Sequence, residues 1–86
     1  MEPYEIAFAR SARKELERLG ESLQTRILER IERLEGQPRP NGCRKLEGAE
    51  DLWRIRIGEY RVIYLLNDVR RSVDVIAIRH RSDAYR

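Results

Sequence analysis

Apolar side chains change their spacing along this chain, and the changes divide it into expected strands and helices. Residues 4–8 (YEIAF) have the composition of a short strand. From Ala9 the apolar residues follow helical spacing, which predicts a helix that stops at Gly20. A second helix is predicted from a cap at Ser22 to a stop at Gly36. Its apolar stripe consists of Leu23, Ile27, Leu28, Ile31 and Leu34.

The second half of the chain has the pattern of a loop followed by strands. Residues 36–45 hold Gly and Pro too densely for regular structure, so we expect a loop there. Strand-like runs follow at about 52–57, 60–66 and 73–79, and the turn NDVRRS separates the last two. This order predicts an α+β fold, with a two-helix hairpin packed on one face of a mainly antiparallel four-stranded sheet. The length allows one domain, 1–86.

The stretch LWRIRIGEYRVIY (52–64) places arginines in the most strand-like part of the chain. If Gly58-Glu59 is a two-residue type II′ loop, Ile57 pairs with Tyr60 and the register of the whole hairpin follows. Strand alternation then gives one apolar face for the helices, made of Trp53, Ile55, Ile57, Tyr60, Val62 and Tyr64. The opposite face, here called the arginine face, holds Arg54, Arg56 and Arg61.

Like charges opposed across a hairpin are destabilising, so the arginine face needs a compensating anion. Either an internal carboxylate neutralises the cluster, with Glu59 and Asp83 as candidates, or the cluster binds an external anion. Arginine suits phosphate because its planar fork makes two parallel charge-assisted hydrogen bonds. Several such groups on one face could hold a phosphate and stabilise charge that develops on it.

The end of the chain, IAIRHRSDAYR, adds further candidates. His80 is on the arginine face if Ile78 is, and neighbouring arginines would there favour its neutral form. A lone histidine is more often structural or simply exposed. Tyr85 could stack on an unpaired nucleobase or pack against the sheet. Arg79 and Arg81 flank His80 and add positive charge.

The charge distribution favours an anionic partner. Residues 1–36 carry seven Lys and Arg against eight Glu, whereas residues 37–86 carry eleven basic against seven acidic residues. Arginine-rich composition by itself can reflect codon bias or heat adaptation, whereas an excess confined to the C-terminal half is better evidence for an anionic partner. In the expected loop, Arg39, Arg44 and Lys45 either touch a phosphate backbone or are solvated.

Other compositional features narrow the class of protein. The single cysteine, Cys43, excludes an internal disulfide, and the chain shows neither a signal-peptide pattern nor an apolar run long enough for a membrane span. We therefore expect a cytoplasmic protein. One Cys and one His among scattered acids do not make a metal-ligand set, and no P-loop or dinucleotide fingerprint is present. An apolar area expected on the arginine face, which would suit a protein partner, consists of Ile63, Leu65, Ile76 and Ile78.

These segments together resemble the RelE/ParE toxin superfamily of bacterial and archaeal toxin–antitoxin systems, closer to its RelE side. The resemblance starts with YEIAFARSARKELERL, continues through PRPNGCRKLEGAEDLWRIRIGEYRVIY and closes with VDVIAIRHRSDAYR. Its most specific parts are KLEG, LWRIRIGEYRVIY and the terminal HRSDAYR. The resemblance implies a ribosome-dependent endoribonuclease that cuts mRNA in the A site, by attack of a ribose 2′-hydroxyl on the adjacent phosphate. It implies no metal and no cofactor.

The resemblance also implies residue roles. Arg61 matches the family arginine that steadies the phosphate, and Arg54 and Arg56 fall where relatives often have lysines. His80 and Arg81 occupy the basic tail motif, and Tyr85 matches a tyrosine near the C-terminus. The catalytic candidates are therefore Arg61, Arg56, Arg54, His80 and Tyr85, and the RNA-binding candidates are Lys45, Arg44, Arg79 and Arg81. Because arginine effectively cannot lose its proton, proton transfer would fall to His80 or Tyr85, or would be replaced by electrostatic stabilisation and positioning.

The partners implied by the resemblance are a cognate antitoxin, the ribosome and mRNA, with operator DNA contacted only through the antitoxin complex and no membrane. The chain ends one residue after Tyr85, so the longer C-terminal helix of some relatives is not expected. Two alternatives stay open: a ParE-like toxin that inhibits DNA gyrase by protein contact, and a nucleic-acid-binding module without activity. The arginine cluster favours the nuclease, because a gyrase inhibitor needs no phosphate site.

Overall fold

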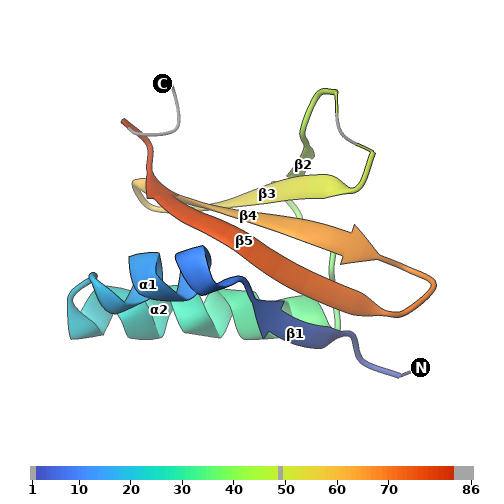
Figure 1. The fold of residues 1–86 in the computed structure, drawn as a ribbon, viewed down its shortest axis with the longest axis horizontal. Helices are drawn as coiled ribbons and strands as arrows, with labels where there is room; N and C mark the ends of the chain where they lie inside the picture. The colour runs from blue at the N-terminus through green and yellow to red at the C-terminus, as the bar shows by residue number, and fades with distance from the viewer. Residues whose placement is uncertain (1, 49, 83–86) are drawn as a thin grey trace.

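The computed structural model describes residues 2–48 and 50–82, and its elements follow the predicted order (Figure 1). In chain order they are β1 (Glu5–Phe8), α1 (Arg10–Glu17), α2 (Glu21–Glu32), the 3-10 turn η1 (Arg33–Glu35), β2 (Arg44–Lys45), β3 (Leu52–Ile57), β4 (Tyr60–Asn67) and β5 (Ser72–His80). The α+β class is confirmed. The sheet of the described residues has five strands where four were predicted, because Arg44 and Lys45 of the expected loop pair with β3 at its edge.

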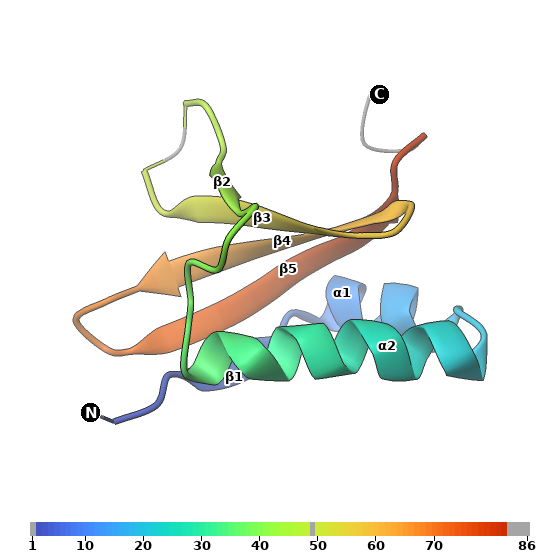
Figure 2. The same ribbon diagram turned by 180° about the vertical axis from the view of Figure 1, so that it is seen from behind.

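Both helices lie against the same face of this sheet, and the arginine face carries no helix within the described ranges (Figures 1 and 2). The strand order is β1-β5-β4-β3-β2. The β1–β5 pair is parallel and the other pairs are antiparallel, so the sheet is mainly antiparallel, as predicted. The segment from β3 to β5 therefore presents a continuous surface on the side away from the helices.

The hydrophobic core fills the space between the helices and the apolar face of the hairpin. From the sheet it takes Ile55, Ile57, Val62 and Tyr64, each at most 1% exposed, as the alternation predicts. From α1 and α2 it takes Ala12, Leu16, Ile27 and Ile31, and from η1 it takes Leu34. The Tyr64 phenol donates a hydrogen bond of 2.6 Å to the Pro38 carbonyl, and burial raises the pKa of this phenol. This bond ties the segment after η1 to the end of the core.

No helix within the described parts of the chain is both long enough and apolar enough to cross a membrane.

The β3–β4 hairpin has the register expected from a two-residue loop. Ile57 pairs with Tyr60, and the pairing continues to Trp53 opposite Tyr64. Gly58 has φ +59°, and Glu59 is not among the described residues with positive φ. This combination excludes a type I′ turn, which needs positive φ at both central residues, and agrees with type II′. The hairpin therefore holds the arginine side chains on a single face, as the alternation requires.

A β-bulge in β5 changes which side chains reach the arginine face. Ile63 pairs with Ala77, whereas the next residue, Tyr64, pairs with Val75, so Ile76 is an extra residue in β5. The bulge reverses the alternation, and Ile78 enters the core with 3% exposure. The expectation that Ile78 lies on the arginine face is therefore wrong.

Helix α1 replaces β1 as the neighbour of β5 beyond this bulge. The amide of Ile78 donates a hydrogen bond of 2.9 Å to Glu15 Oε1, and the Ser11 hydroxyl donates one of 3.4 Å to the Ile76 carbonyl. Side chains of α1 thus make the hydrogen bonds that a neighbouring strand would otherwise make to the backbone of β5. These contacts stabilise the bulge from outside the sheet.

Candidate active site

A row of arginines crosses the arginine face close to the β3–β4 turn. Strand pairing sets Arg56 opposite Arg61, and Arg61 opposite Arg79. Arg56 and Arg79 are exposed, whereas Arg61, on the central strand, is partly buried. Arg79 Nε lies 3.4 Å from Glu15 Oε2, so helix α1 reaches the outer end of the row. Three arginines from three neighbouring strands thereby stand side by side on one face of the sheet.

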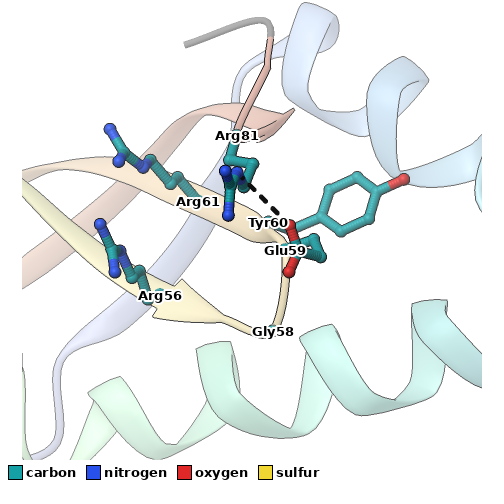
Figure 3. A pocket seen from close by; sticks show the side chains of 6 residues that line it. All are labelled: Arg56, Gly58, Glu59, Tyr60, Arg61 and Arg81. Atoms are coloured by element: carbon teal, nitrogen blue, oxygen red, sulfur yellow. Dashed lines mark ion pairs between the residues drawn. The ribbon is translucent and has the colours of Figure 1, made fainter. Parts of the chain in front are cut away.

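A hollow of about 250 Å³ opens beside this row (Figure 3). Its lining consists of Arg56, Gly58, Glu59, Tyr60, Arg61 and Arg81. Arg56 and Arg61 rise from the hairpin on the side away from the helices, and Arg81 reaches toward them from beyond the end of β5 (Figure 3). The space far exceeds the roughly 30 Å³ that one water molecule occupies in the liquid. It can therefore hold an anionic group between guanidinium forks.

The predicted trio of arginines is only partly brought together at this hollow. Arg54 is not one of the described residues that line it, since it lies two positions farther from the turn than Arg56, about 6.6 Å along β3. Arg81 supplies the third lining arginine instead. On the sheet, Arg54 stands opposite Arg44 of β2 on one side and opposite Ile63 of β4 on the other. Arg44 and Arg54 thus begin a second row, next to the one at the hollow.

The RNA-binding candidates divide between the two faces. Arg44 pairs with Arg54 and Arg79 pairs with Arg61, so both are on the arginine face. Lys45 pairs with Trp53 and is therefore on the opposite face of the sheet. The reason is strand alternation along β2, which the expectation of a loop did not anticipate.

One of the two carboxylates considered as internal counter-ions is found next to an arginine. Glu59 Oε2 lies 3.5 Å from Arg81 Nε, and the amide of Arg81 donates a hydrogen bond of 2.7 Å to the Glu59 carbonyl. Both side chains are nearly two-thirds exposed, and an ion pair so open to water contributes little to stability. Asp83, the other candidate, lies outside the described residues. An incoming phosphate could therefore displace Glu59 from Arg81 at small cost.

His80 is not on the arginine face. It pairs with Tyr60, and the two rings meet edge to face with centroids 5.3 Å apart. The amide of Ser82 donates to His80 Nδ1 at 3.2 Å, so this nitrogen acts as an acceptor. The bulge at Ile76 is the physical cause, because it turns His80 and Ile78 toward the helix side together. Tyr85, the other candidate for proton transfer, lies outside the described residues.

Two features of the hollow were missed from the sequence. Both Arg81 and Glu59 line the hollow, whereas the sequence predicts Arg81 only as an RNA-binding residue and Glu59 only as a counter-ion. The sequence does contain a signal for Glu59. It occupies the two-residue loop of the hairpin, and this loop lies next to the strand positions that carry Arg56 and Arg61. No local signal identifies Arg81, because its position depends on the bulge in β5.

Comparisons with known proteins find ParE and RelE toxins. A family model described as the ParE toxin of the type II toxin–antitoxin system parDE matches residues 6–85. The chain is 33% identical to Toxin RelE of Mycobacterium tuberculosis (strain ATCC 25618 / H37Rv) over 85 residues. The aligned region covers 98% of this chain and 88% of that protein.

Solved structures of RelE toxins have the same fold. A chain in the RelE–RelB complex from the archaeon Pyrococcus horikoshii OT3 superposes with a TM-score of 0.82 and is 32% identical, and the match covers 92% of this chain and 96% of that one. The intact E. coli RelBE toxin–antitoxin complex contains one with a TM-score of 0.77 and 27% identity, over 87% and 93% of the two chains.

Proposed function

The chain belongs to the RelE/ParE superfamily of type II toxin–antitoxin toxins, and on this premise we propose that it is a ribosome-dependent endoribonuclease that cleaves mRNA in the A site. The observation that carries the proposal is the hollow on the arginine face, where Arg56, Arg61 and Arg81 surround a space of about 250 Å³. A gyrase inhibitor that acts by protein contact has no need of such a site. The resemblance implies a reaction that requires neither metal nor cofactor.

In the proposed reaction the scissile phosphate occupies the hollow. The neighbouring ribose 2′-hydroxyl attacks the phosphorus, the bond to the 5′-oxygen breaks, and a 2′,3′-cyclic phosphate results. Negative charge on the phosphoryl oxygens increases in the transition state. Guanidinium groups that line the hollow would therefore stabilise the transition state more than the ground state. Arg61 has the central part, because it stands between Arg56 and Arg79 and is partly buried.

The second row, Arg44 and Arg54, would hold the RNA beyond the scissile phosphate. Residues two apart on a strand are about 6.6 Å apart, which is close to the separation of successive phosphates in an extended single strand. The row at the hollow and the row at Arg54 can therefore bind consecutive phosphates. Basic grooves that follow the backbone of single-stranded nucleic acid bind it in this way.

We further propose a cognate antitoxin as the protein partner, with operator DNA contacted only through that complex. The solved relatives from P. horikoshii and E. coli are toxin–antitoxin complexes. On this chain, Leu65 of β4 is 39% exposed on the arginine face, with Ile63 two residues away on the same face. An antitoxin segment that covers this apolar area would also block the arginines beside it.

Arg61→Ala tests the nuclease directly. We expect single-turnover cleavage of an mRNA on ribosomes with an empty A site to slow by at least 10²- to 10³-fold, as when one transition-state donor is removed elsewhere. The matched control is Arg33→Ala, an exposed arginine of η1 on the helical layer, which should cleave like the wild type. Circular dichroism of both variants should retain the wild-type spectrum. Unimpaired cleavage by a folded Arg61→Ala protein would remove Arg61 from the mechanism.

Inhibition of DNA gyrase is the second candidate, because the matching family model is that of the ParE toxin. The two functions separate in one comparison. Purified wild-type protein is added to gyrase supercoiling reactions and, in parallel, to translating ribosomes whose mRNA ends are mapped. The nuclease predicts new mRNA ends at the A site and unaffected supercoiling. Inhibited supercoiling with intact mRNA would establish the alternative.

A further inference from the structure

The proposed cleavage needs a group that takes the proton of the attacking 2′-hydroxyl, and the arginines cannot do so, because they stay protonated. His80, expected as one candidate, faces the helix side and contacts Tyr60. Among the described residues that line the hollow, only Glu59 carries a carboxylate. Tyr60 turns its ring away from the guanidinium groups (Figure 3). This ring instead meets that of His80 edge to face.

We propose that Glu59 is the general base of this reaction, an inference that rests on the proposed nuclease function. Two contacts with Arg81, one from the backbone of Glu59 and one from its carboxylate, place this residue beside the phosphate site. The carboxylate oxygen Oε2 lies 3.5 Å from Arg81 Nε, and the Glu59 carbonyl accepts the Arg81 amide at 2.7 Å. A phosphodiester bound to the outer fork of Arg81 therefore has its ribose next to Glu59. This position is within reach of a general base, which must approach its proton to hydrogen-bond distance.

The charged groups around Glu59 are arginines from several elements. Arg56 is on β3, Arg61 on β4 and Arg81 beyond β5, and all three line the hollow. Arg26 of α2 approaches the turn from the helix side of the sheet. Its Nη2 atom lies 3.3 Å from the position that a Cβ atom would occupy on Gly58. Since the substrate phosphate and Glu59 both attract these groups, substrate binding loosens the weak Glu59–Arg81 pair and leaves the carboxylate available for a proton.

The chemical step balances without an added oxidant, reductant or metal. The O–H bond of the 2′-hydroxyl breaks and its proton passes to the Glu59 carboxylate, while the 2′-oxygen forms a bond to phosphorus. The bond from phosphorus to the 5′-oxygen breaks, and this oxygen takes a proton from water. Glu59 then returns its proton to solvent. The products are a 2′,3′-cyclic phosphate and a 5′-hydroxyl end.

Glu59→Gln keeps the shape of the side chain and removes its basicity. Single-turnover cleavage of mRNA is measured on ribosomes with an empty A site. We expect Glu59→Gln to be 10²- to 10⁴-fold slower, the usual contribution of a general base. Glu29→Gln, the same substitution at an exposed glutamate of α2, is the matched control and should retain the wild-type rate.

Binding separates a base from a merely structural residue. Affinity for a 2′-O-methyl RNA oligonucleotide, which cannot react, should be equal or higher in Glu59→Gln, because a negative charge is removed from the phosphate site. Lost cleavage with retained binding supports the inference. A Glu59→Gln rate within threefold of the wild type would overturn it while the nuclease function stands. If the wild-type protein leaves mRNA intact, the proposed function fails and this inference fails with it.

Discussion

At the scale of single residues, Asp68 in the β4–β5 turn joins segments that are distant in the sequence. The Tyr4 phenol donates to Asp68 Oδ1 at 2.6 Å, and the Arg39 fork donates to both carboxylate oxygens at 3.2 and 2.8 Å. The Arg39 guanidinium also lies over the Trp53 ring, 4.9 Å from its centroid. The hydrogen bonds from Arg39, followed by the one from Tyr4, lower the pKa of Asp68 to about 2. Asp68 thus holds the N-terminal residues and the segment after η1 against the end of the sheet.

This network predicts an acid-sensitive contribution to stability. Because the pKa of Asp68 in the folded state is below its usual value, the contribution is fully present above about pH 4 and is lost as the pH falls toward about 2. Asp68→Asn should therefore be less stable than the wild type at pH 7, and the difference should shrink between pH 4 and pH 2. Urea unfolding at a series of pH values measures it. The control is Asp51→Asn, the same change at another exposed aspartate; a Asp68→Asn deficit that persists unchanged at pH 2 would contradict the argument.

At the scale of elements, the two-residue turn between β3 and β4 sets the position of the site. It determines that Arg56 and Arg61 are opposite each other, and it brings Glu59 to the rim of the hollow. The turn depends on Gly58, whose φ of +59° is in the left-handed region that side chains with a Cβ disfavour. A Cβ there would also lie 3.3 Å from Arg26, although the end of that flexible side chain can move.

Gly58→Ala should destabilise the fold by about 1 to 2 kcal/mol, the strain of one L-residue in this region. For a domain of this size, each kcal/mol lowers Tm by about 4 to 8 °C. Thermal unfolding followed by circular dichroism measures the change. Gly36→Ala is the matched control, since Gly36 has φ −97° and no atom lies within 4 Å of the added Cβ. Equal Tm values for the two variants would show that the turn tolerates a side chain.

At the scale of the whole molecule, charge is divided between the two faces of the sheet. The net charge is +3, but the arginine face gathers Arg44, Arg54, Arg56, Arg61 and Arg79, with Arg81 at its end. Such a surface attracts a polyanion from a distance and releases counterions when it binds. The fold thus turns a modest overall charge into a strong local field on the side that no described helix covers.

RNA affinity should accordingly depend strongly on salt. For single strands, log K falls with log salt by a slope of about 0.7 for each phosphate neutralised. Arg44→Ala should reduce the slope by about that amount, because Arg44 is on the arginine face opposite Arg54. Arg70→Ala, in the β4–β5 turn, should leave it unchanged. Fluorescence anisotropy of a 2′-O-methyl RNA oligonucleotide at several salt concentrations measures both. An unchanged slope in Arg44→Ala would exclude Arg44 from the RNA path.

The predictable parts of the fold are those in which one local rule determines the result. A two-residue loop permits a single hairpin register, so the pairing from Ile57–Tyr60 to Trp53–Tyr64 follows from sequence. The short strand β2 could not be predicted in this way, because two residues in a Gly- and Pro-rich segment show no periodicity. The position of β5 could not be predicted either, since a longer turn leaves the register open.

Helical and strand periodicity act over a few residues, so the α+β class, the apolar face of the hairpin and the adjacent positions of Arg56 and Arg61 follow from the amino-acid sequence alone. The tertiary fold is needed to bring Arg81 and Glu59 to the hollow and to place His80 on the other face of the sheet. The reason is the bulge at Ile76, which contacts with α1 hold in place. One extra residue moves every later side chain of the strand to the opposite face of the sheet. Contacts between segments that are distant in the sequence determine where this residue is inserted.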